Sequence, residues 1–329
     1  MAAATSLQIS APATPLATPQ PTVVLGEPVG LFSHTGGRSD TVFYLAVIFP
    51  VVSVPIILLR LWASKFIVKK WHIDDTLTVI ATIFAVLQSV AVAVEARLGA
   101  GDHIITMTPE GISLLLKIGK WAGVPLYNLT TLFIKASVLM FYLRFFVDAT
   151  FRMVTYGVLF VVIAYSMVNV IATFALNCEN NAACDQLFRV YITCAAVNVA
   201  TDFAILLLPF WLLRPMKVPF ARKVGIAVVL MGGGFVTGVS IYRLVITIRV
   251  DSEADVTYGW GESVKWSLIE SWSGIICASL PCLKTVFSRY LPNFPLWRRL
   301  SDASASLAHR RLATISGQPA PETREIPAA

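Results

Sequence analysis

The sequence predicts an all-α integral membrane protein, a bundle of seven transmembrane helices. Of its 329 residues, 56% are hydrophobic and only 14% are charged. Soluble domains rarely combine so few charges with so much apolar content. The apolar residues also fall into seven runs, each near the ~20 residues that a helix needs to cross a bilayer. Only helices satisfy the backbone hydrogen bonds of such runs within lipid.

The predicted domain organisation follows from these runs and from the composition at the two ends. Residues 1–40 are rich in Ala, Thr and Pro and predict a disordered extracellular tail. Residues 41–290 form the seven-helix domain, and 291–329 predict a basic, disordered cytosolic tail. The third helix starts as early as Ile112. The seven runs lie at about 42–61, 75–96, 121–142, 153–176, 187–213, 223–248 and 264–287.

Charged residues alternate in sign from one connection to the next. The positive-inside rule then predicts an N-terminus outside and a C-terminus in the cytosol. The basic connections and tail carry Arg60, Lys65, Lys69 and Lys70; Arg144 and Arg152; Arg214, Lys217, Arg222 and Lys223; and Lys284, Arg289, Arg298 and Arg299. The acidic connections carry Asp102 and Glu110; Glu179 and Asp185; and Asp251, Glu253 and Asp255.

Asp74 and Asp75 open the second run at the predicted cytosolic edge. Carboxylates at a helix start cap free N–H groups and interact favourably with the helix dipole. A contact with the neighbouring basic connections is the alternative interpretation.

The cysteines and histidines indicate neither a disulfide scaffold nor a metal site. Cys178 and Cys184 share the polar stretch NCENNAAC, and the predicted orientation places them on an oxidising face, where they are expected to pair. The four histidines are scattered, so we expect no metal and no cofactor. The net charge of +7 forms no basic stripe with interleaved aromatic residues, which argues against a nucleic-acid partner. The expected partner is the lipid bilayer.

The order of several short motifs resembles the fungal rhodopsin-domain family, including the satratoxin-cluster type of integral membrane protein. The motifs are IDD, EARLGAGDH, FIKASVLMFYLRFF, NVATDFAILLLP, IYRL and WSLIESWSGIICASLPCLK, in that order over about residues 43–290. The resemblance implies a receptor-like protein or a member of a secondary-metabolite gene cluster.

The last run argues against a retinal pigment. A retinal Schiff base needs a lysine amine within the last helix. Lys265 and Lys284 stand at the two ends of this run, and none lies between them.

Two intramembrane ion pairs are predicted from depth. Glu270 lies eight residues from Glu262, about 12 Å inward, and Arg243 lies about 9 Å inward from Arg249. Their similar depths on consecutive helices predict a Glu270–Arg243 pair. Two roles remain open for this pair. It either holds the helices together, or it contacts a ligand or substrate, because intramembrane charges are often functional.

The second predicted pair lies nearer the cytosol, where Lys135 and Asp202 occupy similar depths on the third and fifth helices. Asn198 stands one turn from Asp202 and, with Asn128, is expected to extend a polar network. Packing and ligand contact remain open for this pair too.

A third group of charges is expected at the outer mouth of the bundle: Glu95, Arg97, His103, Lys117 and Lys120. It either binds an acidic ligand or shuttles protons, or Glu95 simply pairs with Lys117 or Lys120. Aromatic residues in the outer and middle parts of the helices line either a ligand pocket or an interfacial belt. These are Trp121, Tyr127, Tyr191, Tyr242, Trp266 and Trp272.

Three functions remain open on the sequence. The first is a seven-helix binding protein, receptor-like or accessory to a metabolite pathway, that holds a small apolar molecule near Arg243 and Glu270. The second is a membrane-embedded cyclase or isomerase that uses Glu270 or Asp202 as a buried, protonated acid, which requires that this residue is not salt-bridged. A transporter ranks last, because the sequence shows no internal repeat.

Overall fold

The structure is a computed structural model, and it describes residues 39–102, 109–145, 148–176, 181–213, 220–252 and 256–290. Almost all of these residues are helical. The predicted tails, apart from Ser39 and Asp40, lie outside the described residues. The helices are α1 (Ser39–Ala63), α2 (Ile73–Arg97), α3 (Pro109–Ile118), α4 (Val124–Phe145), α5 (Ala149–Ala175), α6 (Asn181–Leu213), α7 (Phe220–Ser252) and α8 (Val256–Tyr290).

The predicted third helix is longer than its apolar core. The helix α3 continues through one turn of π-helix, η3 (Gly119–Gly123), into α4. Together they form one span from Pro109 to Arg144, in agreement with the early start expected near Ile112. A similar π-helical turn, η1 (Ser64–Val68), ends α1.

Six helical segments of the described chain are long and apolar enough to cross a membrane, whereas the sequence predicted seven. The one that falls short is α8. It carries serines and a buried glutamate, Glu270, which lower its hydropathy. The polar residues of α8 face protein rather than lipid, because α8 packs against α1, α2, α4 and α7.

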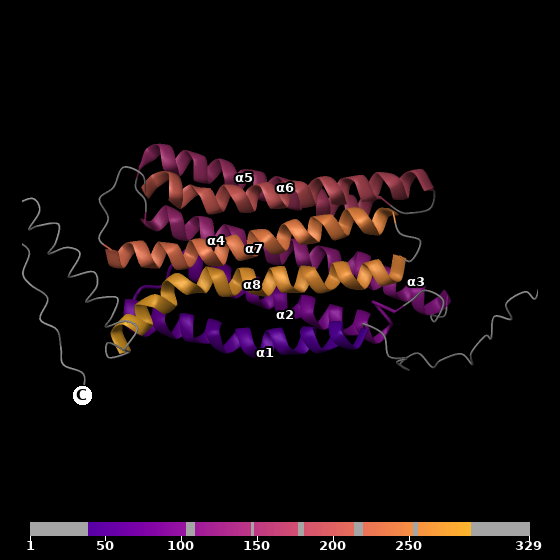
Figure 1. The fold of residues 1–329 in the computed structure, drawn as a ribbon, viewed down its shortest axis with the longest axis horizontal. Helices are drawn as coiled ribbons and strands as arrows, with labels where there is room; N and C mark the ends of the chain where they lie inside the picture. Colours follow the sequence, from indigo (N-terminus) through magenta and orange to yellow (C-terminus); the bar gives the residue numbers. More distant parts are fainter. Residues whose placement is uncertain are drawn as a thin grey trace, which may run out of the picture.

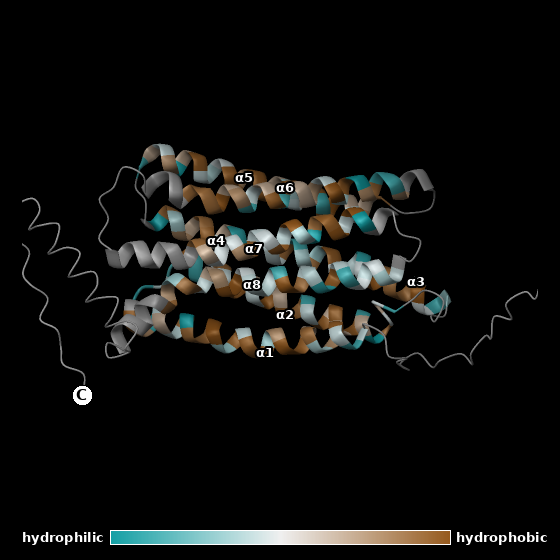
Figure 2. Ribbon diagram, in the orientation of Figure 1, coloured by the Kyte–Doolittle hydropathy of each residue, from teal (hydrophilic) through white to brown (hydrophobic). Residues whose placement is uncertain are grey.

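The helices run side by side along the long axis of the molecule (Figure 1), with α5 and α6 on one side and α1 and α2 on the other. Between them lie α4, α7 and α8. Figure 2 shows strongly hydrophobic stretches along α1, α2 and α5, and paler, more polar stretches along α8. Large apolar side chains such as Met153 and Phe160 are exposed on the outside of the bundle, as expected for surfaces that face lipid.

One end of the bundle is held together by Arg60 and is called here the Arg60 end. The sequence placed Arg60 in a connection, but it lies within α1 and is fully buried. Its guanidinium contacts Asp74 at 3.2 Å and Asp75 at 3.5 Å, and it donates to the carbonyl oxygen of Ala278 on α8 at 2.5 Å. Arg60 thus ties α1 to α2 and to the turn of α8 before Pro281.

The aspartates therefore do more than cap α2. Both are buried, and Arg144 lies 3.9 Å from the second oxygen of Asp74. Asp75 also accepts a hydrogen bond from the backbone N–H of His72, the residue before the helix. His72, Asp74 and Asp75 each offer a ligand atom within 4.8 Å of the others, but the two carboxylates already have guanidinium partners.

Candidate functional site

The predicted pair between α7 and α8 is confirmed. Arg243 Nε lies 2.7 Å from Glu270 Oε2, and both residues are buried. The other oxygen of Glu270 accepts hydrogen bonds from Ser240 at 2.9 Å and Asn198 at 2.8 Å. The carboxylate has three hydrogen-bond donors, one of them cationic, which offsets much of the cost of removing it from water.

The second predicted pair is confirmed as well. Lys135 Nζ on α4 lies 2.9 Å from Asp202 Oδ1 on α6. The ammonium also donates to Asn198 Oδ1 and Thr201 Oγ1, each at 2.8 Å. These contacts satisfy the three donors of a lysine ammonium.

Asn198 joins the two pairs into one network. Its side-chain oxygen accepts from Lys135 and from the hydroxyl of Tyr165 at 2.9 Å, while its N–H donates to Glu270. The polar network predicted from Asn198 is therefore present. Asn128 is buried as well, but its side-chain N–H donates to the carbonyl oxygen of Val124 in the same helix. This hydrogen bond does not connect Asn128 to the network.

The network lies between two cavities. The Tyr127 cavity is lined by residues of the network, Asn198 and Arg243, and extends toward Glu95 and Trp260. The Pro281 cavity is lined by Lys135, Asp202 and mostly apolar residues. The Tyr127 cavity leaves about 110 Å³ open to the centres of water molecules, several times the ~10–15 Å³ that one ordered water needs.

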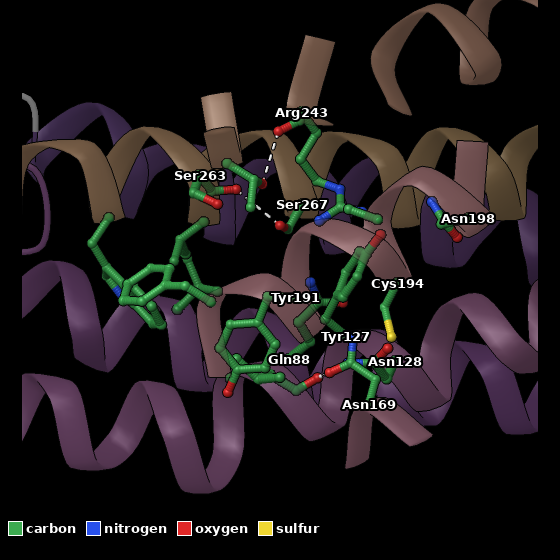
Figure 3. A pocket seen from close by; sticks show the side chains of 18 of the residues that line it. Gln88, Tyr127, Asn128, Asn169, Tyr191, Cys194, Asn198, Arg243, Ser263 and Ser267 are labelled. Carbon is green, nitrogen blue, oxygen red and sulfur yellow. Dashed lines mark hydrogen bonds between the residues drawn. The ribbon is translucent and has the colours of Figure 1, made fainter. Parts of the chain in front are cut away.

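Aromatic rings form much of the wall of the Tyr127 cavity. The ring of Tyr127 stacks under the Arg243 guanidinium, with 4.6 Å from Cζ to the ring centroid. Figure 3 shows Arg243 and Tyr127 close together at the cavity. Tyr191 and Trp260 line the same space. Rings and a few polar groups around a concave space are typical of small-molecule sites.

Several buried polar atoms of this wall lack a hydrogen-bond partner among the described residues. They are Glu95 Oε1, the Tyr127 hydroxyl and Asn169 Oδ1. Within the described residues, Arg243 donates to the protein through Nε, so its two terminal nitrogens remain for other acceptors. Unpartnered buried polar groups are uncommon, and each calls for a partner such as water or a ligand.

The charges expected at the mouth are arranged differently from the prediction. Glu95 is fully buried and pairs with neither Lys117 nor Lys120. Its Oε2 accepts a hydrogen bond from the indole N–H of Trp260 at 3.1 Å instead. Lys120 donates to the carbonyl oxygen of Leu176 at 2.8 Å, and Lys117 is exposed on α3.

The reason for this difference is geometric. Gly123 lies in the π-helical turn η3, and a Cβ at this position would stand 2.7 Å from Glu95 Oε1. The carboxylate therefore fills the space beside η3 that the missing side chain of Gly123 leaves open. His103 lies outside the described residues, and Arg97 is exposed, with its guanidinium 3.9 Å from the ring centroid of Phe43.

The predicted aromatic group divides into cavity, core and surface residues. Tyr127 and Tyr191 line the cavity. Trp272 is fully buried and donates to Ser89 at 2.9 Å. Trp121 and Tyr242 are exposed, as expected for a belt or a lipid-facing surface, and Tyr242 stacks against Trp266 with centroids 4.4 Å apart.

Two further expectations concern Lys265 and the cysteines. The ammonium of Lys265 pairs with Glu262 at 2.7 Å, and Lys265 is not among the residues that line the Tyr127 cavity. Cys184 is disulfide-bonded, but Cys178 lies outside the described residues, so pairing between these two stays a prediction. Of the other cysteines, Cys194 is free and lines the Tyr127 cavity.

The sequence interpretation missed several polar residues of the site. Gln88, Asn169 and Trp260 line the cavity, and Ser240 and Thr201 support the ion pairs. Gln88 and Asn169 carried a usable signal, because an amide within an apolar run is uncommon and often functional. Trp260 gave no comparable signal, since tryptophans are common near membrane interfaces.

The comparisons with known proteins agree with one another. The fungal rhodopsin domain matches residues 59–289. The chain is 26% identical to wortmanamides biosynthesis cluster protein C of Talaromyces wortmannii, over 82% of this chain and 75% of that protein. It is 22% identical to fugralins biosynthesis cluster protein 2 of Gibberella zeae, over 72% and 62% of the two chains. A SAT4 family membrane protein of Emericella nidulans is 26% identical over 58% of this chain and 51% of its own length. No solved structure matches the chain.

Proposed function

This chain belongs to the fungal rhodopsin-domain family of integral, multi-pass membrane proteins, and we propose that it is a non-catalytic binding protein. Its ligand is a small, apolar, ring-containing molecule held in the Tyr127 cavity. The protein acts as a receptor-like or accessory component of a secondary-metabolite pathway. Two relatives are named as biosynthesis cluster proteins, which supports the pathway context.

The observation that carries the proposal is the set of unpartnered polar atoms in an otherwise largely apolar and aromatic cavity. The Tyr127 hydroxyl and Asn169 Oδ1 have no hydrogen-bond partner among the described residues, and Arg243, which lines the same cavity, donates to Glu270 through Nε. A ligand with an apolar body and one or two polar groups satisfies these atoms while its rings pack on Tyr127 and Tyr191.

The enzyme alternative depended on an unpaired acid, and its two candidates do not meet that condition. Glu270 is paired with Arg243, and Asp202 is paired with Lys135. Deletion of the gene in its fungal host, followed by metabolite profiling, distinguishes the two functions. Uniformly lower output of the pathway supports an accessory role, whereas accumulation of one intermediate would indicate catalysis and contradict the proposal.

We also propose that the Arg60 end faces the cytosol. The basic residues Lys65, Lys69 and Arg144 lie at this end, and basic residues are retained on the cytosolic side. The Tyr127 cavity then opens toward the opposite face. A tag at residue 5 is expected to be reached by antibody on intact cells and a tag at residue 325 only after permeabilisation; the reverse pattern would overturn this orientation.

The binding proposal is tested by filling the cavity. Ala195 is buried on α6 and lines the cavity, whereas the next residue, Ala196, is exposed. Ala195→Phe is expected to lower the saturable binding of 1-ethylnaphthalene, a simple apolar ring probe, by about tenfold or more. The matched variant Ala196→Phe adds the same ring on the lipid side and is expected to bind as the wild type does.

The measurement uses the full chain in lipid nanodiscs, and naphthalene fluorescence reports the saturable component of binding. Thermal unfolding of both variants shows whether the bundle remains intact. Equal binding by Ala195→Phe and Ala196→Phe would contradict a ligand site in this cavity.

A further inference from the structure

We propose that the ligand of the Tyr127 cavity carries a protonated amine, and that Glu95 binds this ammonium group. The inference rests on the proposed binding function and specifies the chemical class of the ligand. It is carried by one side chain, the fully buried Glu95, and by what surrounds it.

Glu95 differs from every other buried acid that the structure describes. Asp74 and Asp75 pair with Arg60, and Glu270 pairs with Arg243. The carboxylate of Glu95 has no cationic partner among the described residues, because its one hydrogen bond comes from the neutral indole of Trp260. A carboxylate removed from water is costly unless a cation accompanies it.

The part of the chain that the structure describes does not supply this cation from nearby. Lys120 turns to the carbonyl oxygen of Leu176, and Lys117 is exposed. Among the described residues, Glu95 Oε1 has no hydrogen-bond partner, and Glu95 is one of the residues that line the cavity. An ammonium group seated beside Glu95 in the cavity supplies the partner that this buried oxygen lacks.

The surroundings of Glu95 suit an ammonium group more than a second anion. Trp260 and Tyr127 line the same cavity, and aromatic faces attract organic cations. Gly123 is part of this arrangement, since a Cβ there would stand 2.7 Å from Glu95 Oε1 and would crowd the oxygen.

The cavity also indicates where the rest of the ligand lies. Trp260, which contacts Glu95, and Glu270, which contacts Arg243, are ten residues apart on α8. This spacing corresponds to about 15 Å along the helix. The amine thus binds at one end, the apolar rings pack in the middle, and Arg243 donates to a carbonyl or another acceptor of the ligand at the far end.

The test uses three probes of nearly equal shape. They are 1-naphthylmethylamine, which is cationic at neutral pH, 1-naphthalenemethanol, which is a neutral donor, and 1-ethylnaphthalene, which has no donor. Binding is measured with the full chain in nanodiscs of uncharged lipid, so that lipid headgroups do not attract the amine.

In the wild type, the amine is expected to bind about tenfold or more tightly than the alcohol, since a hydrogen bond between charged groups is the stronger one. Glu95→Gln is expected to abolish this preference while the protein still binds 1-ethylnaphthalene saturably. Saturable binding of that probe also shows that the variant is folded. Glu262→Gln is the matched control, because Glu262 lies on α8 near Trp260 but does not line the cavity; it is expected to keep the preference.

Each contrary outcome has a distinct meaning. Equal binding of amine and alcohol by the wild type overturns the ammonium site, and this comparison needs no variant. Equal binding of all three probes overturns it too but leaves the proposed apolar site intact. Failure of the wild type to bind any probe contradicts the binding function itself.

Discussion

Glu270→Gln is expected to lower the free energy of unfolding by about 3–5 kcal/mol, because it leaves the buried guanidinium of Arg243 without its counter-ion. The two groups are 2.7 Å apart, with side-chain exposures of 9% for Arg243 and 3% for Glu270, so water cannot replace the lost partner. The double variant Glu270→Gln with Arg243→Gln is expected to recover part of this loss.

The double-mutant cycle measures this coupling directly. Glu262→Gln serves as the control, because Glu262 and Lys265 form a more exposed pair on the same helix and such pairs contribute about 0–1 kcal/mol. Unfolding is followed for the purified protein in detergent. Additive effects of Glu270→Gln and Arg243→Gln would show that the pair is not coupled and would reopen a catalytic role for Glu270.

Arg60→Met is expected to destabilise the protein by a similar amount, about 3–5 kcal/mol. The change keeps much of the apolar stem but leaves Asp74 and Asp75 buried without their shared cation, and it removes the hydrogen bond to Ala278. The expected result is a lower unfolding temperature and less folded protein in the membrane.

The control for this variant is Lys65→Met, since Lys65 is an exposed cation one turn after Arg60. It is expected to change stability by less than about 0.5 kcal/mol. If Arg60→Met were as stable as Lys65→Met, the Arg60 cluster would not hold α1, α2 and α8 together.

Much of the helical framework could be predicted from the sequence, because lipid imposes long, continuous apolar helices. Counting residues from the helix ends also placed Glu270 beside Arg243 and Lys135 beside Asp202, since depth changes by a fixed ~1.5 Å per residue. Predicting these pairs required only the depth of each residue and the adjacency of the helices.

The sequence predictions differ from the structure where the depth of a residue in the membrane does not by itself determine its partner. Arg60 was placed in a connection because a basic residue ended an apolar run, but it is inside α1, opposite two aspartates of α2. Of the two alternatives for the outer cluster, the pairing of Glu95 with Lys117 or Lys120 is wrong, because the carboxylate lies beside Gly123 of the π-helical turn η3 and accepts from Trp260. The seventh predicted span, α8, is less apolar than the other six, because it carries serines and Glu270.

The Tyr127 cavity itself has no simple signature in the sequence. Its walls come from α2, α4, α5, α6, α7 and α8, so its shape depends on how six helices pack. Tyr127 and Tyr191 were candidates, but nothing in their spacing distinguished them from Trp121 or Tyr242, which are exposed.

Photoaffinity labelling tests directly whether the Tyr127 cavity is a ligand site. A diazirine derivative of naphthalene is bound to the protein in nanodiscs, illuminated, and the labelled residues are identified by mass spectrometry. Labels are expected on cavity residues such as Tyr127, Tyr191 and Trp260, and both excess 1-ethylnaphthalene and Ala195→Phe are expected to reduce them strongly. Labels confined to exposed, lipid-facing residues such as Phe160 and Met231, with no competition by excess 1-ethylnaphthalene, would contradict a ligand site in the cavity.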